Sequence, residues 1–152
     1  MKNVTELNKL KVRLFVEAVW NEGRLELIDE LVAADYVGHV PCLEVEVLGP
    51  EGVRGLVSSG RRAYPDMYVK IKDQIAEDDR VVTRWQATAT AQDAHAHGAA
   101  TRGTQSYTGI SIVRLLGGKQ VDAHTEYTVL APAPPPRTPR PRTRSPGRAR
   151  AV

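Results

Sequence analysis

His124 and Glu126 are the residues of this chain whose types and spacing best fit proton-transfer chemistry. Side chains two positions apart in a strand share one face, so an imidazole and a carboxylate would lie side by side. Burial of that face would raise the pKa of the Glu126 carboxyl and suit it to general acid/base catalysis. The alternation leaves a second interpretation open. Ala123 and Tyr127 mark an opposite, more apolar face, and if that face is the buried one, the pair lies in solvent.

A second group of residues could bind a small apolar ligand. His39 could orient a carbonyl group, although a partly buried structural histidine is an equally good interpretation. Four aromatic residues could form the wall of a pocket or could simply belong to the core; they are Trp85, Tyr107, Trp20 and Phe15.

No metal or cofactor is predicted. His95 and His97 form a His-x-His pair that can bind zinc, but they lack a third clustered ligand. The sequence contains no glycine-rich nucleotide loop and no nucleophile elbow.

The composition predicts one cytoplasmic domain followed by a tail. The chain of 152 residues is long enough for a real core. It has no apolar run of the roughly 20 residues that a membrane helix needs, and no apolar signal core at its N-terminus. Its one cysteine, Cys42, excludes an internal disulfide and a cysteine metal cluster. We therefore expect no membrane association and a cytoplasmic location.

The basic charge of the chain belongs to its C-terminal end. Residues 132–152 hold six of the 21 Lys and Arg residues and none of the 18 acids, so the remainder has 15 basic and 18 acidic residues, a net charge of −3. The folded domain, expected over residues 1–131, therefore offers no basic surface for nucleic acid. The proline- and arginine-rich segment 132–152 cannot form a core and is expected to be disordered.

The hydrophobic patterns predict three helices before a sheet. Residues 3–20 fit an amphipathic helix whose buried stripe holds Leu7, Leu10, Leu14, Phe15 and Ala18. A short helix follows near residue 28, and a third begins at Gly49-Pro50 and ends before Pro65. From Met67 onward the period changes to two, which predicts four long antiparallel strands, the last two joined at Gly117-Gly118. This order is typical of the α+β class, with helices on one face of a curved sheet.

Several segments carry a resemblance to a known family, in the same order and with the same spacing. The chain resembles the SnoaL-like polyketide cyclases of the nuclear transport factor two-like superfamily, which includes ketosteroid isomerase. The resemblance covers about residues 5–130. The matching segments are FVEAVWNEG at 15–23, DELVAADYVGH at 29–39, GPEGVR at 49–54, YPD at 64–66, IAEDDRVVTRW at 75–85 and TGISI at 108–112.

The resemblance implies a cone-shaped, curved antiparallel sheet packed against three N-terminal helices, an α+β barrel that usually forms a homodimer. It also implies a pocket inside the cone for a small apolar or polyketide-like ligand, and a role in antibiotic biosynthesis. Characterised members close a ring by an intramolecular aldol reaction without a cofactor, using an acidic side chain on the last strand as general acid/base. By this resemblance Glu126 would be the base, with His124 or His39 as hydrogen-bond donor.

The chain departs from the family pattern at the last strand, which often reads His-Trp-Asp. Counted without a gap from Gly118-Lys119, Ala123 and Thr125 stand where that His and Asp would be. A one-residue bulge instead places His124 and Glu126 there, because a slip of one residue exchanges the two faces of a strand. Residues 98–103, GAATRG, also lack two usual prolines, and the tail replaces the usual closing helix.

The sequence therefore leaves three functions open. The first is a cofactor-free cyclase in which Glu126 and His124 perform acid/base catalysis. The second is a non-catalytic small-molecule-binding module, which is favoured if Ala123 and Thr125 face the pocket. The third is another cone-fold enzyme, an isomerase, epoxide hydrolase or hydroxylase-like protein.

Overall fold

The computed structural model describes residues 3–41, 43–90 and 104–130. The tail at 132–152 and the loop at 92–103 lie outside the described residues. Among the described residues, no helix is long and apolar enough to cross a membrane. The helical elements are α1 (Val4–Leu14), the π-helix η1 (Phe15–Asn21), the 3₁₀ helix η2 (Leu25–Leu27), α2 (Ile28–Leu31) and α3 (Gly49–Ala63). The strands are β1 (Val32–His39), β2 (Val47–Leu48), β3 (Tyr68–Glu77), β4 (Arg80–Thr90), β5 (Thr104–Leu116) and β6 (Lys119–Leu130).

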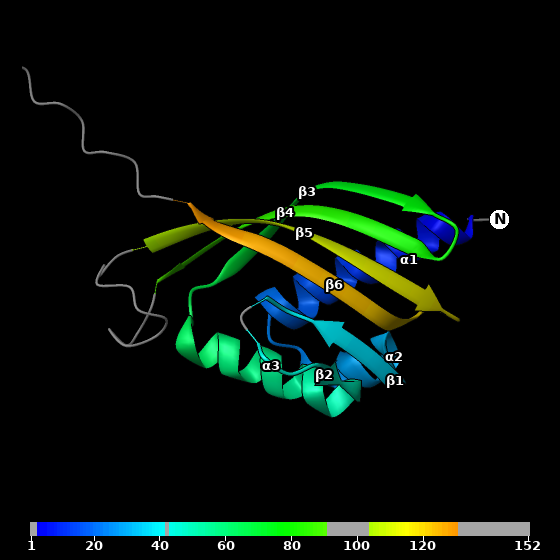
Figure 1. The fold of residues 1–152 in the computed structure, drawn as a ribbon, viewed down its shortest axis with the longest axis horizontal. Coiled ribbons are helices and arrows are strands. Elements are labelled where there is room, and N and C mark those ends of the chain that lie inside the picture. Colours follow the sequence, from blue (N-terminus) through cyan, green and yellow to red (C-terminus); the bar gives the residue numbers. More distant parts are fainter. Residues whose placement is uncertain (1–2, 42, 91–103, 131–152) are drawn as a thin grey trace, which may run out of the picture.

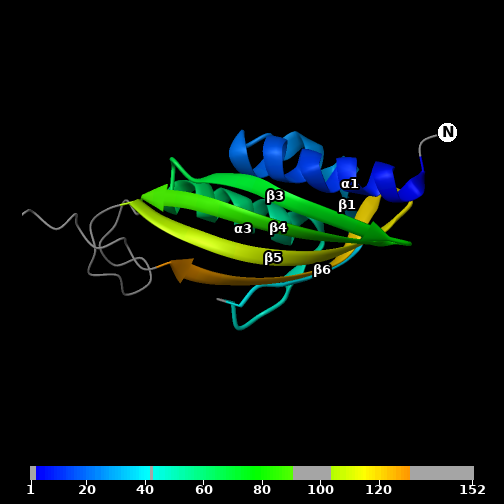
Figure 2. The ribbon, with the colours of Figure 1, turned by 90° about the horizontal axis from the view of Figure 1, so that it is seen from above.

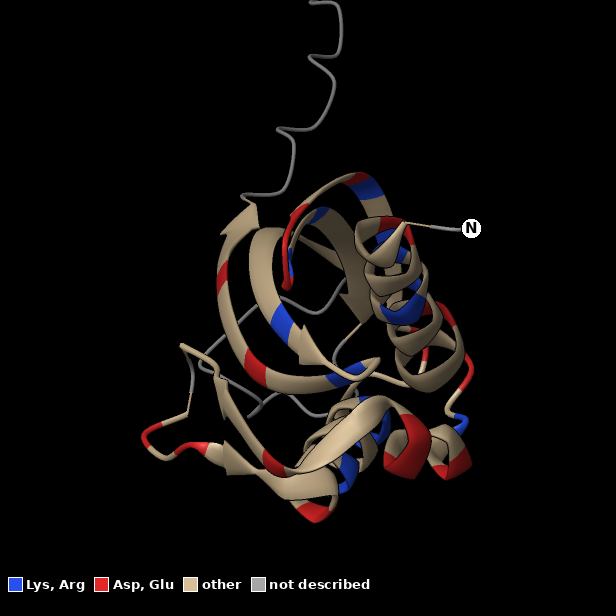
Figure 3. Cartoon of the chain, turned by 90° about the vertical axis from the view of Figure 1, so that its right-hand side faces the viewer, with Lys and Arg blue, Asp and Glu red and all other residues tan. Residues whose placement is uncertain are grey.

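The strands form one curved sheet in the order β2-β1-β6-β5-β4-β3, and the helices pack against one side of it (Figures 1 and 2). Viewed from its end, the sheet is strongly curved and unclosed (Figure 3). The predicted α+β cone fold is confirmed, including the β5–β6 hairpin, in which Gly117 and Gly118 adopt φ values of 57° and 78°. Such positive φ values favour glycine and give a two-residue turn that matches the strand twist.

β1 makes the sheet mixed, whereas the family resemblance implied a purely antiparallel one. It pairs in parallel with β6, so that His39 stands opposite His124 and Gly38 opposite Ala123. A register shift separates these pairs from the pair at Val32. This long-range pairing joins the N-terminal region of the chain to the last strand.

The core shows which face of each strand points toward the helices. Residues Val81 on β4, Val113 on β5 and Ala123 on β6 are buried in one cluster with side chains of the helices. Because side chains alternate along a strand, the odd-numbered residues of β4 and β5, and Ala123, Thr125 and Tyr127 on β6, share this helix-facing side. The helices contribute Val12, Val19, Ile28, Leu31, Val53 and Val57 to the same cluster.

The buried stripe of the first helix agrees with the predicted one only at its C-terminal end, where Ala18 is buried and Phe15 packs against the core. Leu7, Leu10 and Leu14 are 44%, 47% and 37% exposed, whereas Asn8 and Val12 are buried. Two neighbouring stripes of this sequence satisfy helical periodicity, one through the leucines and one through Asn8, Val12 and then Val19 in η1. Packing against the sheet buries the second stripe, and helical periodicity alone cannot predict which of the two is buried.

Candidate functional site

Three side chains on neighbouring strands form a hydrogen-bonded chain on the helix-facing side. The Nε1 of Trp85 donates to the Oγ of Ser111 over 3.0 Å, and that oxygen lies 2.9 Å from the Oγ1 of Thr125. An indole N–H can only donate, so the Ser111 oxygen accepts. One hydroxyl hydrogen then joins Ser111 to Thr125, whichever of the two donates. The other hydroxyl hydrogen of the pair is left to donate to a further acceptor.

Two tyrosines extend this surface. The rings of Tyr127 and Trp85 are 6.4 Å apart, and Tyr107 meets Tyr127 edge to face at 6.1 Å, distances at which aromatic pairs attract. All of these side chains are partly exposed. We call Trp85, Tyr107, Ser111, Thr125 and Tyr127 the aromatic wall.

The aromatic wall is a neutral surface. The helix-facing residues of β4, β5 and β6, as far as the structure describes them, include no Asp, Glu or His. Burial, followed by the neighbouring Tyr64, raises the pKa of Tyr107. On β1, burial and then the charge of Asp122 raise the pKa of Tyr36 to about 12. Both phenols therefore stay protonated at neutral pH and act as hydrogen-bonding groups rather than as bases.

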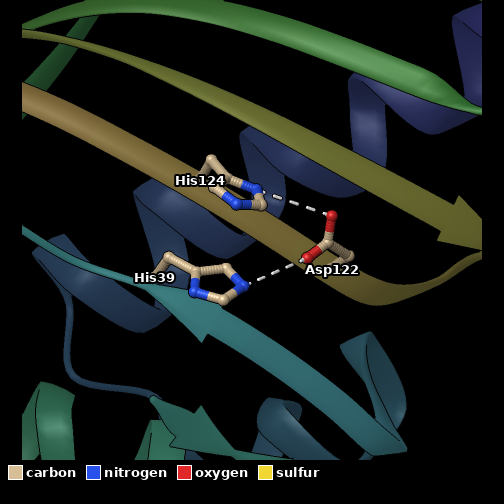
Figure 4. Close-up of side chains that lie close together, drawn as sticks. All are labelled: His39, Asp122 and His124. Atoms are coloured by element: carbon tan, nitrogen blue, oxygen red, sulfur yellow. Dashed lines mark ion pairs between the residues drawn. The ribbon is translucent and has the colours of Figure 1, made fainter. Parts of the chain in front are cut away.

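His124 and Glu126 lie on the opposite, outer face of β6, where both are exposed. The His124 ring stacks on His39 at a centroid distance of 4.1 Å, so His39 lies on the outer face as well (Figure 4). Both histidines approach the carboxylate of Asp122, at 3.6 Å from Nδ1 of His124 and 3.9 Å from Nε2 of His39. Glu126 lines an open depression of about 310 Å³ together with Thr108, Gly109, Ile110, Tyr127 and Thr128.

The structure thus brings some of the predicted site residues together and separates others. Trp85 and Tyr107 share the aromatic wall, whereas His39 lies with His124 across the sheet from it. Trp20 and Phe15 are partly buried against the core, and the Trp20 ring lies close to Gly60 of α3. The catalytic role of Glu126 and His124 and the ligand-binding role of the others remain predictions.

Sequence reasoning missed the Ser111–Thr125 pair, Tyr127 and the contribution of Asp122. The sequence did hold a signal for Ser111, Thr125 and Tyr127, because these residues alternate with outer-face residues along their strands as Trp85 does on β4. β6 also carries a register shift, between the pairs Arg114–Asp122 and Leu115–Gln120, that leaves Val121 unpaired with β5. With that shift, Ala123 and Thr125 face the helices, which is the orientation that favours the non-catalytic binding module among the functions left open by the sequence.

Comparisons with known proteins agree with this architecture. No curated protein matches the chain in sequence. The proposed hydroxylase AclR from Streptomyces galilaeus is 27% identical, with a TM-score of 0.66, and the match covers 82% of this chain and 90% of AclR. The proposed polyketide cyclase IdmH from Streptomyces antibioticus is 26% identical, with a TM-score of 0.68, over 79% of this chain and 91% of IdmH. A proposed SnoaL-like cyclase from Jannaschia sp. CCS1, at 13% identity and a TM-score of 0.73, shares the fold over 84% of this chain and 89% of its own. The model of the SnoaL-like polyketide cyclases matches residues 10–131, and the chain belongs to that family.

Proposed function

We propose that this protein binds a polyketide-like or other apolar carbonyl compound against the aromatic wall and promotes its ring closure without a cofactor. The observation that carries the proposal is the chain from Trp85 through Ser111 to Thr125, which leaves one hydroxyl hydrogen for an acceptor. Thr125 stands where the ungapped match to the family places its catalytic acid. A neutral donor in that position can bind a carbonyl oxygen and stabilise the negative charge that develops on it.

Ring closure on such a wall is an intramolecular aldol reaction. Solvent water takes up the α-hydrogen as a proton, the resulting enolate carbon attacks a second carbonyl carbon of the same molecule, and the new alkoxide takes a proton back from the solvent. A 1,3-dicarbonyl segment enolises readily, so the protein contributes mainly by holding the two carbons together and polarising a carbonyl group. The aromatic rings of Tyr107 and Tyr127 would pack against the apolar remainder of the ligand.

The two tryptophans allow a direct test of where the ligand binds. We expect a hydroxyanthraquinone, a fused aromatic polyketide, to quench the fluorescence of a Trp20→Phe variant, whose remaining indole is Trp85. The matched Trp85→Phe variant keeps only Trp20, which lies near Gly60 outside the wall, and should be quenched far less. Equal quenching of both variants, or quenching of Trp20 alone, would place the ligand elsewhere and contradict the proposal.

A second candidate function keeps Glu126 as general base with His124 beside it. Its support is the depression that Glu126 lines on the outer face. A carboxylate in that open position keeps its water unless a further surface covers it. Dimerisation through the outer face could supply such a covering. Glu126 is the register partner of Ile110, which lies on that face.

We propose that two copies associate through this outer face, where Ile110 and Ile112 are 48% and 44% exposed. Light scattering should give twice the 16.7 kDa of one chain. An Ile110→Glu variant should be monomeric, because a charge at the centre of an apolar contact loses its water without a partner. Val45→Glu, at a loop residue that is 74% exposed, should remain dimeric. A monomeric parent at micromolar concentration would refute this interface.

A further inference from the structure

We propose that His39, Asp122 and His124 bind one divalent transition-metal ion on the outer face of the sheet. Each residue offers one ligand atom, and these atoms all lie within 4.8 Å of one another. The three residues converge from two strands, as Figure 4 shows. They do not belong to the aromatic wall, so the metal site is separate from the first proposed carbonyl site. It shares His124 with the second candidate function and borders the proposed dimer face at Ile112, the register partner of His124.

The backbone holds these ligands in place. His39 and His124 are register partners in the parallel β1–β6 pair, and Asp122 precedes His124 by two positions on the same face. With zinc bonds of about 2.0–2.1 Å, tetrahedral geometry places neighbouring ligand atoms about 3.3 Å apart. The nitrogen–oxygen distances of 3.6 and 3.9 Å run to different oxygens of Asp122, and one ligand atom from each residue lies within 4.8 Å of the others, so the cluster is wider than a formed site. To complete three ligands, the stacked imidazole rings of His39 and His124 would have to turn so that their nitrogens converge on the ion, with water as the fourth ligand.

A second carboxylate supports one of the ligands. The Oε1 of Glu46 lies 3.6 Å from Nδ1 of His39, the ring nitrogen not directed at Asp122. In metal sites the second nitrogen of a histidine ligand usually donates to a carboxylate, which fixes the tautomer and strengthens the ligand. At 3.6 Å the contact is longer than a hydrogen bond, so Glu46 would have to approach His39 slightly to support it in this way.

The ligand types select the class of ion. Imidazole nitrogens suit Zn²⁺, Co²⁺, Ni²⁺ and Cu²⁺, whereas Mg²⁺ and Ca²⁺ prefer oxygen ligands. A bound ion would tie β1 to β6 at the place where the N-terminal region joins the last strand. Its effect would be to stabilise this junction, because an ion that binds the folded state alone raises the stability of that state.

The test uses the full-length, tag-free chain with Co²⁺ and Zn²⁺ as probes. We expect one Co²⁺ per chain, with visible absorption bands of tetrahedral coordination, displacement by Zn²⁺, and a Zn²⁺-dependent rise in melting temperature. Mg²⁺ should produce none of these changes. Asp122→Asn and His124→Gln should each weaken binding by more than the 10- to 100-fold that is usual for an outer-shell change. His124 is 59% exposed, so its replacement should leave the metal-free protein folded.

Two further variants separate this site from other histidines and from a simple charge cluster. A variant with both His95→Asn and His97→Asn should bind the probes like the parent. Glu46→Gln should weaken Zn²⁺ binding by about 10- to 100-fold while the metal stoichiometry stays at one. Absence of Co²⁺ bands, unchanged binding in the Asp122 and His124 variants, or binding lost with His95 and His97 would each overturn the proposal.

Discussion

Replacing Gly109 by alanine should lower the melting temperature of this protein by about 2–12 °C. A Cβ added at Gly109 would lie only 2.3 Å from Cζ2 of Trp85 and 2.6 Å from Cε2, much closer than carbon atoms approach in proteins. The ring cannot simply turn away, because its Nε1 is bonded to Ser111 on the neighbouring strand. Overpacking of this kind costs about 1–3 kcal/mol, and each kcal/mol moves the midpoint of a domain near this size by about 2–4 °C.

The chain provides its own control for this substitution. A Cβ at Gly55, within α3, has no heavy atom within 4 Å, so Gly55→Ala should leave stability unchanged or raise it by about 0.5–1 kcal/mol. In a Trp85→Leu background the clashing ring atoms are gone, and Gly109→Ala should then cost much less than in the parent. Thermal unfolding of the parent, the two single variants and the double variant measures the coupling between Gly109 and Trp85. Additive effects would mean that Gly109 does not act by making room for Trp85.

Local pattern was sufficient to predict most of this fold. The change of period at Met67, the paired glycines at 117–118 and the proline at the start of α3 each determine structure within a few residues. The parallel pairing of β1 with β6 was not predicted, because it joins residues far apart in the chain and depends on packing. The prediction that the leucines of α1 are buried was wrong for a related reason. Two stripes satisfy the helical period, and only contact with the sheet distinguishes them.

The site was harder to predict, because each candidate depends on the face of a single strand. Thr125 and Glu126 are neighbours in sequence, yet a strand sends their side chains to opposite sides of the sheet. The irregular register near Asp122 makes the assignment of faces uncertain from sequence alone. The cluster of His39 with His124 was also beyond sequence reasoning, since it exists only because β1 and β6 pair in register.

Because Thr125 and Glu126 are neighbours that face opposite sides of the sheet, Thr125→Val and Glu126→Gln form a matched pair of variants. Thr125→Val keeps the side-chain shape but removes the hydroxyl that pairs with Ser111. We expect it to slow deuterium uptake at the α-carbon of an aryl 1,3-diketone by about 10²–10³-fold, the usual cost of losing one donor to a developing oxyanion. Glu126→Gln keeps its shape and lies on the outer face, so its rate should remain close to that of the parent.

The opposite result would favour the second candidate function, with Glu126 as the base, over the first. If Glu126 is the base, Glu126→Gln should lose about 10²–10⁴-fold in rate with little change in binding, and Thr125→Val should be nearly silent. Thermal unfolding will show whether a lost rate reflects lost folding. Removing one hydroxyl pair should lower the free energy of unfolding by only about 0.5–1.5 kcal/mol. His124→Gln separates the cases further. It should reduce turnover only if the outer face performs the chemistry, whereas the aromatic-wall mechanism predicts an unchanged rate in metal-free buffer.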